Sequence, residues 1–157
     1  MIVEISTYHS EVFMNERFER FTVLIAKISR NIRKIKNREM ADYGLKSAHV
    51  SCLYYLYTSE ALTATDLCER CEEDKATISR SIDYLEKNGY IVCQSKKAKR
   101  YKAPLVLTEK GEMAGKRIAD KIKGVLDGMG DELTSGEREN FYRCLSIISD
   151  NLDSLAT

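Results

Sequence analysis

The sequence predicts a mainly α-helical fold that carries one small two-stranded β element. Apolar residues recur at helical spacing near both ends of the chain. One proline and eight glycines are few for a turn-rich β fold. The helical period gives way to two short β-like runs only after Gly89. A length of 157 residues suits one compact fold with a sizeable core.

The first predicted helix lies in the N-terminal segment, residues 1–40. Apolar side chains alternate there by three and four residues, which places them on one face of a helix. Gly44 follows as a helix stop. The stripe consists of Met14, Phe18, Phe21, Ile25, Ile28, Ile32 and Ile35.

Two shorter helices are predicted next. Ser47 suits the cap of the second helix, whose inward residues are Val50, Leu53 and Leu56. Thr63 suits the cap of a third helix over residues 64–71, and Asp66 stands at the capping-box position.

A tight turn leads to the fourth predicted helix, over residues 75–88. Asp74 suits its cap, and Gly89 suits its end. The inner stripe of this helix is Ile78, Ile82 and Leu85.

The runs "YIVCQS" and "APLVL" then predict two short strands. Between them lies the stretch "SKKAKRYKAP", residues 95–104, which has five basic residues and no acid. Pro104 favours an edge strand or the start of a strand.

Two further helices are predicted in the C-terminal part of the chain. Thr108 suits the cap of a helix that reaches about Met129, and Gly128 and Gly130 are expected to break it. Thr134 and Glu137 then form a capping box for the last helix. Its apolar stripe is Phe141, Leu145, Ile148, Leu152 and Leu155.

The order helix, tight turn, helix, strand, basic loop, strand is the layout of a winged helix-turn-helix. The second helix of such a pair fits the major groove of DNA, which is about 12 Å wide. Its first turn, "DKATISR", offers hydrogen-bond donors and small polar side chains outside the inner stripe. Arg80 can read a guanine edge through two hydrogen bonds. Lysine, serine and threonine can hold phosphates.

Charge is polarised along the chain, although the formal net charge is only +1. Residues 75–102 contain eight basic and two acidic residues, a balance of +6. Residues 124–157 contain two basic and seven acidic residues, a balance of −5. Such a distribution steers one side of a protein towards a polyanion.

The run "LTATDLCERCEEDKATISRSIDYLEKNGYIV", followed by "LVLTEKG", resembles the MarR/SlyA family of bacterial transcription regulators across residues 62–111. The resemblance implies a homodimeric repressor that binds a pseudo-palindromic site on double-stranded DNA and is released by a small-molecule effector. It also implies a DNA-binding region over residues 45–107, between dimerisation helices over residues 1–40 and 108–157.

Two departures from the family pattern stand out. Without gaps, the aspartate and arginine that brace the family's wing fall on Lys99 and Tyr101. We therefore expect a softer wing, with Arg100 reaching the minor groove. Glu72 occupies a turn position where glycine is common, and Glu73 one where a hydrophobic residue is common. Some strain is expected there.

The sequence and the resemblance together predict two sets of site residues. The predicted DNA contacts are Ser47, Thr63, Thr65, Lys75, Ala76, Thr77, Ser79, Arg80, Lys96, Lys97, Lys99, Arg100 and Lys102. The predicted dimer contacts are Met14, Phe18, Phe21, Phe141, Leu145, Ile148 and Leu152.

The cysteines admit two interpretations. Cys68 and Cys71 form a C-x-x-C motif, but no second pair or neighbouring histidine accompanies it, so buried packing is favoured over metal or redox chemistry. Cys93, near the start of the wing, leaves open a thiol-based redox-responsive regulator. His49 is interpreted as a satisfied polar residue, and no metal site or cofactor is predicted.

Other function classes remain as alternatives or are disfavoured. A winged helix can also serve as a protein-binding adaptor, its wing docked on an acidic partner. Tyr54, Tyr55 and Tyr57 suit either a small aromatic effector or core packing, so no effector residue is assigned. No nucleophile–base pair or glycine-rich phosphate loop indicates an enzyme. The absence of a signal-like N-terminus and of a long apolar run predicts a cytoplasmic protein without membrane contact.

Overall fold

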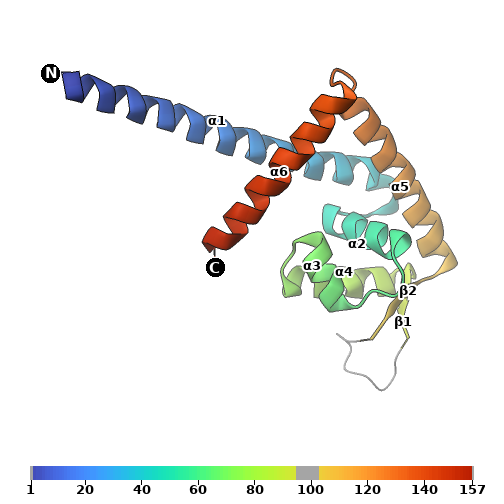
Figure 1. Ribbon diagram of the computed structural model, residues 1–157. Coiled ribbons are helices and arrows are strands. Elements are labelled where there is room, and N and C mark those ends of the chain that lie inside the picture. Colours follow the sequence, from blue (N-terminus) through green and yellow to red (C-terminus); the bar gives the residue numbers. More distant parts are fainter. Residues whose placement is uncertain (1, 95–102, 157) are drawn as a thin grey trace. The chain divides into compact units, whose positions relative to one another are not determined.

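The structure is a computed structural model that describes the backbone of residues 2–94 and 103–156, and the side chains from Glu16 onwards within those ranges. Figure 1 shows the elements in order along the chain. They are α1 (Ile2–Glu39), the 3₁₀ turn η1 (Ala41–Tyr43), α2 (Ser47–Thr58), α3 (Ala64–Cys71), α4 (Lys75–Lys87), β1 (Ile91–Cys93), β2 (Leu105–Leu107), α5 (Glu109–Met129) and α6 (Ser135–Ala156). The mainly α prediction with one small β element is confirmed.

The chain forms two compact units, Met1–Ile118 and Ala119–Thr157. The core of the first unit lies where α2, α3, α4 and the β1–β2 hairpin pack together. Its centre is apolar and fully enclosed, as expected for a helix-turn-helix domain that buries one face of each element. The largest fully buried side chains are Met40, Leu53, Leu67, Ile78, Leu85, Ile91, Ile118 and Cys52.

The connection between α1 and α2 is closed by Gly44. This glycine adopts a left-handed backbone conformation with φ of 66°, and its N–H donates to the Ala41 carbonyl. Helix α1 itself already ends at Glu39, so Gly44 ends the 3₁₀ turn η1 and not the long helix as predicted. A side chain at this φ would be strained. A Cβ at Gly44 would also lie 3.0 Å from the hydroxyl of Tyr84, which donates to the Gly44 carbonyl.

The start of α2 differs from the prediction. Ser47 is already helical, and Lys46 occupies the cap position in an extended conformation. The backbone N–H of Lys46 donates to Nδ1 of His49 at 3.1 Å, and the N–H of Ser47 donates to Oδ1 of Asn37 at 2.7 Å. The capping role assigned to Ser47 is therefore wrong, because partners from His49 and from α1 satisfy these amides instead.

The two strands pair antiparallel, with Val92 opposite Val106. The hairpin extends beyond the strands, because the N–H of Gln94 donates to the carbonyl of Pro104 at 3.1 Å. Pro104 immediately precedes β2, in agreement with the prediction of a strand start. On the other side of β2, the N–H of Leu105 donates to the carbonyl of Leu62 at 2.9 Å, which ties the hairpin to the segment before α3.

Helix α5 begins in close contact with the end of α4. The Thr108 hydroxyl accepts from the N–H of Gly111 at 3.1 Å and donates to the carbonyl of Gly89 at 2.6 Å. The predicted cap at Thr108 is confirmed. A Cβ at Gly111 would overlap the carbonyl oxygen of Tyr90, so the glycine allows this close approach. Helix α5 ends at Met129, as predicted, with Gly130 directly after it, whereas Gly128 lies inside the helix.

The second unit contains the end of α5 and all of α6. The predicted capping box is confirmed, because the hydroxyl of Thr134 donates to Oε2 of Glu137 at 2.7 Å and accepts from its backbone N–H at 3.3 Å. Arg138 secures the preceding turn by donating to the Gly130 carbonyl at 2.8 Å. None of the described residues of α6 is buried.

The apolar stripes of the terminal helices are exposed in the single chain. In α1, Phe18 is 70% exposed and Ile28 45% exposed, whereas in α6 Phe141 is 45% exposed. The side chain of Met14 lies outside the described residues. Among the helices of residues 2–94 and 103–156, none combines the length and apolarity of a membrane span.

Gly111 and Gly124 provide a matched test of the α5 packing. We expect Gly111→Ala to lower the free energy of unfolding by about 1–3 kcal/mol, because its methyl group would overlap Tyr90. Gly124→Ala, where a Cβ meets nothing within 4 Å, should raise it by about 0.4–1 kcal/mol. Urea denaturation measures both values. Equal effects of the two substitutions would contradict the close approach.

Candidate nucleic-acid interface

The first helix of the pair, α3, is fixed by a reciprocal cap. The hydroxyl of Thr63 donates to Oδ2 of Asp66 at 2.8 Å, and the backbone N–H of Thr63 donates to the same oxygen at 2.7 Å. Hydrogen bonds from the backbone and hydroxyl of Thr63 lower the pKa of the Asp66 carboxyl. The predicted capping box is thus confirmed, with the Thr63 hydroxyl engaged inside the protein.

The turn between the two helices is strained at Glu72. This residue ends α3 in the left-handed region, with φ of 52° and ψ of 44°. Its backbone N–H bonds back to the carbonyls of Cys68 and Glu69. A non-glycine residue costs free energy in this conformation. The prediction of strain at Glu72 is therefore confirmed, and its source is the left-handed cap of α3.

Helix α4 begins with a small network at its exposed N-terminus. Asp74 accepts from the backbone N–H of Thr77 and from its hydroxyl, both at 2.8 Å. These two bonds lower the pKa of the Asp74 carboxyl. The hydroxyl oxygen of Thr77 also accepts from Nη2 of Arg80 at 3.2 Å. The network thereby holds the Arg80 guanidinium against Thr77, which lies one helical turn before Arg80 on α4.

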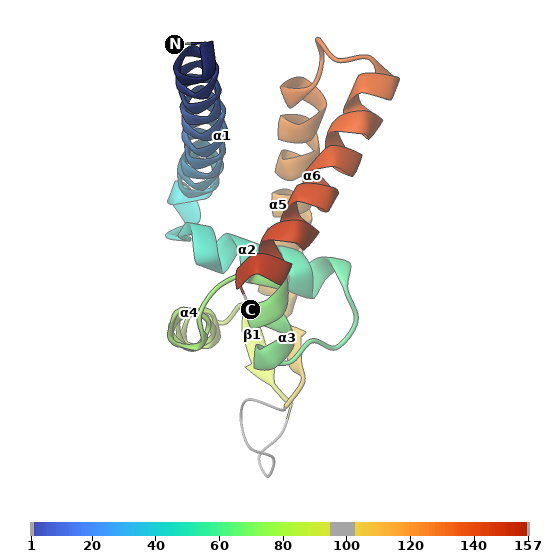
Figure 2. The same cartoon turned by 60° about the vertical axis from the view of Figure 1, so that its left-hand side comes forward.

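The two faces of α4 differ sharply in burial. Ile78, Ile82 and Leu85 are buried together with Ser81, so the predicted inner stripe is confirmed. Figure 2 shows α4 almost end on. The predicted contact residues on the first two turns lie outside the buried stripe. Four of them are exposed, namely Lys75, Ala76, Ser79 and Arg80, and Thr77 is partly buried.

The rear of α4 is anchored by aromatic residues that the sequence patterns did not single out. The Tyr84 ring stacks on the His49 ring with 4.2 Å between centroids, and its hydroxyl donates to the Gly44 carbonyl at 2.9 Å. The Tyr90 hydroxyl donates to the Tyr43 carbonyl at 3.4 Å. The satisfied polar role predicted for His49 is confirmed, because its Nδ1 accepts from the backbone N–H of Lys46. Burial lowers the pKa of His49.

The remaining predicted contacts lie at other helix starts or outside the described residues. Ser47 and Thr63 are half-buried at the starts of α2 and α3, whereas Thr65 is exposed on the first turn of α3. The basic residues between the strands lie outside the described residues, as does Tyr101. These are Lys96, Lys97, Lys99, Arg100 and Lys102. All these contact assignments stay predictions.

Comparisons with known proteins decide the family. A model of the MarR family matches residues 43–100, which include both helices of the pair and the first strand of the hairpin. An uncharacterized HTH-type transcriptional regulator of Bacillus subtilis (strain 168), YwoH, is 31% identical over 98 residues, or 62% of this chain and 71% of that protein. The chain belongs to the MarR family. Its function is therefore DNA-binding transcription regulation.

Solved structures of the MarR family share the fold. Staphylococcus aureus MepR, solved in complex with DNA, superposes with a TM-score of 0.75 at 16% identity, over 83% of this chain and 97% of that one. Staphylococcus aureus MarR, solved with salicylate and kanamycin, superposes with a TM-score of 0.75 at 14% identity, over 87% of this chain and 92% of that one. The winged helix-turn-helix class is thus confirmed.

Two cysteines of this MarR family chain, Cys68 and Cys71, are less buried than predicted. Cys68, Cys71 and Cys93 are partly buried rather than enclosed, whereas Cys52 is fully buried. No burial was predicted for Cys52, although the spacing of His49, Cys52 and Leu56 places it on the inner face of α2. Within the part of the chain that the structure describes, no three potential metal ligands cluster.

The tyrosines of α2 are partly buried and include one clear packing residue. Tyr57 lies against α5, because a Cβ at Gly115 would lie 2.6 Å from the Cβ of Tyr57. Tyr54 and Tyr55 form an edge-to-face pair with 5.4 Å between ring centroids. For Tyr57 the geometry favours the core-packing interpretation over a ligand contact.

Glu72 and Glu73 provide a test of the strained turn. We expect Glu72→Gly to raise the free energy of unfolding by about 1 kcal/mol, because glycine adopts its φ of 52° without strain. Glu73→Gly should lower it by up to about 1 kcal/mol, because Glu73 lacks a positive φ. Urea midpoints at unchanged m-values compare the two. Destabilisation by both substitutions would show that the left-handed cap carries no strain.

Proposed function

We propose that this MarR family regulator is a homodimeric repressor that inserts the outer face of α4 into the major groove of its operator. The observation that carries the proposal is the exposed set Lys75, Ser79 and Arg80 opposite a fully buried apolar stripe. A helix with this division packs on its own domain through one side and offers hydrogen-bond donors on the other.

The proposed division of labour among the residues follows their chemistry. Arg80 reads a guanine edge, because its guanidinium can donate two hydrogen bonds to one base. Lys75, Thr77 and Ser79 hold phosphates and set the register, with Ser47 and Thr65 at the flanking helix starts. The helix N-termini at these positions add backbone N–H groups that favour phosphate.

The basic stretch between the strands supplies a second contact in this proposal. Its lysines neutralise phosphates beside the groove that α4 enters, and Arg100 reaches the minor groove. Lys99 and Tyr101 replace the pair that usually braces the wing. We therefore expect this stretch to contact phosphates along the DNA backbone and not to read particular bases.

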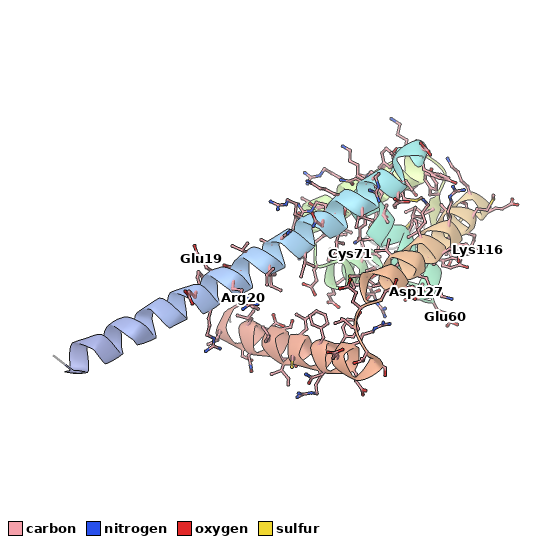
Figure 3. All side chains as sticks on the ribbon, turned by 90° about the horizontal axis from the view of Figure 1, so that it is seen from above. Glu19, Arg20, Glu60, Cys71, Lys116 and Asp127 are labelled. Atoms are coloured by element: carbon pink, nitrogen blue, oxygen red, sulfur yellow. The ribbon has the colours of Figure 1, made fainter. Side chains whose placement is uncertain are left out.

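The homodimer is proposed from the terminal helices, over residues 1–40 and 108–157. Apolar stripes on α1 and α6 stay exposed in the single chain, and burying such stripes is the main driving force for association. Figure 3 shows α1 running far beyond the helix-turn-helix, where Glu19 and Arg20 are labelled. A second copy of the chain would cover these stripes and leave the region of residues 45–107 for DNA.

Release by a small aromatic molecule is the proposed mode of regulation. The related Staphylococcus aureus MarR was solved with salicylate, a small aromatic anion. Tyr54 and Tyr55 provide partly buried aromatic surface in this chain. An effector that binds the DNA-free conformation more tightly would shift the population away from the operator-bound one.

A gel-shift titration with DNA from upstream of the coding sequence tests the proposal. We expect a specific complex that survives excess non-specific DNA at moderate salt and weakens on addition of salicylate. Absence of a specific shift would favour the rival function, a winged-helix adaptor for an acidic protein. A specific shift that salicylate leaves unchanged would remove that effector and retain the DNA-binding role.

Arg80 should set sequence discrimination. We expect Arg80→Lys to reduce the preference for the operator over a guanine-substituted site by about 1–3 kcal/mol, because lysine keeps the charge but loses the bidentate fork. Lys87→Ala, at the far end of α4, is the matched control and should retain the preference. Fluorescence anisotropy with both DNAs measures it. Unchanged discrimination in Arg80→Lys would remove Arg80 from base readout.

Lys97 and Lys99 should act on all DNA alike. We expect the double variant Lys97→Ala with Lys99→Ala to weaken operator and random DNA by the same factor. The slope of log affinity against log salt concentration should become shallower by up to about two, because fewer counterions are released when the chain binds DNA. Titrations at several salt concentrations measure the slope. A slope equal to that of the unmodified chain would show that neither lysine contacts phosphate.

Leu145 should lie in the dimer interface. We expect Leu145→Glu to raise the dimer dissociation constant by more than about tenfold, because a charge would be buried in an apolar contact. Ser146→Glu adds the same charge on the neighbouring position, outside the apolar stripe, and should change it little. Sedimentation equilibrium measures both constants. Equal constants for the two variants would place the interface elsewhere.

A further inference from the structure

The second half of α1 carries a dense positive charge that the predicted DNA contacts do not include. Residues 21–38 contain six basic residues and no acid, whereas residues 16–20 contain two acids and two arginines. The change from mixed to purely positive charge therefore falls within one continuous helix. The six basic residues are Lys27, Arg30, Arg33, Lys34, Lys36 and Arg38.

Two of these six cations are engaged within the chain. Nζ of Lys36 donates to Oγ of Ser51 at 2.9 Å. Nη2 of Arg38 donates to Oε1 of Glu39 at 2.9 Å, and the two groups form an ion pair. The other four are exposed, and the part of the chain that the structure describes gives them no hydrogen bond or ion pair. These four form the basic face of α1, namely Lys27, Arg30, Arg33 and Lys34.

The spacing within the basic face places like charges next to each other. Arg30 lies three residues after Lys27 and four residues before Lys34. Residues three or four apart are neighbours on a helix surface, and like charges there destabilise the helix. A partner with closely spaced negative charges would relieve this repulsion. The free helix therefore carries an electrostatic cost that binding of a polyanion would remove.

The basic face points away from the apolar stripe of α1. Arg30 lies two residues after Ile28 and two residues before Ile32, and both isoleucines belong to the stripe. Side chains two positions apart on a helix do not face the same side. A second copy of the chain that covered the stripe would therefore leave the basic face open to another partner.

The basic face continues on the side of α1 that meets the start of α2. Oδ1 of Asn37 accepts from the backbone N–H of Ser47 at 2.7 Å, so Asn37 points towards the first turn of α2. Asn37 lies four residues after Arg33 and three after Lys34, which places all three on one side of α1. At about 1.5 Å per residue, Arg33 lies about 6 Å and Arg30 about 10 Å along the helix axis from Asn37.

We propose that the basic face of α1 binds phosphates of double-stranded DNA beside those held at the start of α2. The inference rests on the proposed function, because Ser47 is a phosphate contact only in that proposal. Continuity with Ser47 favours DNA over an acidic protein as the polyanion. The basic face adds phosphate contacts and no base readout, so it strengthens binding to operator and random DNA alike.

Two arginine pairs on α1 provide a matched test. Arg30→Gln with Arg33→Gln removes two charges from the basic face, whereas Arg17→Gln with Arg20→Gln removes two at the same spacing in the mixed segment, where Figure 3 labels Arg20. Glutamine retains a good helix propensity. Fluorescence anisotropy at several salt concentrations measures binding to operator and random duplexes. We expect the slope of log affinity against log salt concentration to become shallower by up to about two in the first variant only. Between about 50 and 200 mM salt, its affinity should therefore fall about tenfold less than that of the unmodified chain.

A charge-conserving variant separates a lost contact from a folding defect. Arg30→Lys with Arg33→Lys keeps both charges and should keep the slope of the unmodified chain, because phosphate binding needs the charge and not the guanidinium fork. Equal slopes for the two glutamine variants would overturn the proposal and point to an acidic protein as the partner. Loss of the slope in the lysine variant would also overturn it. Equal affinity of the unmodified chain for operator and random DNA, with the slope difference retained, would instead contradict the proposed repressor function and leave the basic face standing.

Discussion

The burial of one side of α4 determines what its other side can do. Ile78, Ile82 and Leu85 lie in the core that α4 shares with α2 and α3. Each such side chain stabilises the domain by about 1.5–3 kcal/mol relative to exposure. Rotation of α4 about its axis would expose all three, so the polar face with Lys75 and Arg80 is held outward. Stacking of Tyr84 on His49 adds a second restraint at the rear of the helix.

The terminal helices α1 and α6 differ from α4, because the single chain does not bury their apolar stripes. Their apolar stripes remain partly exposed within the described single chain, as the 70% exposed Phe18 and the 45% exposed Phe141 show. A second copy would cover both stripes, and its two-fold symmetry would relate two α4 helices. Dimerisation would thereby set the spacing of the two DNA contacts.

Local chemistry was predictable from the sequence, and contacts between distant residues were not. The caps at Thr63, Asp74 and Thr134 depend on residues within three positions, so composition and spacing predict them correctly. Ser47 failed as a cap because its partner, Asn37, comes from another helix. The stacking of Tyr84 on His49 depends on how α4 packs on α2, which no local pattern encodes. The strain at Glu72 was predictable only in part. The sequence shows a glutamate at a position where glycine is common, but it does not show that this residue adopts a left-handed backbone conformation.

Footprinting of the protein on its operator tests the central claim most directly. Methylation protection reports guanine N7 atoms in the major groove, the surface that α4 is proposed to enter. Two symmetry-related α4 helices predict two protected clusters whose centres are about 10–10.5 base pairs, or one helical turn, apart. Arg80→Lys should lose protection at one guanine in each cluster. A single protected cluster, or protection confined to the minor groove, would contradict the account.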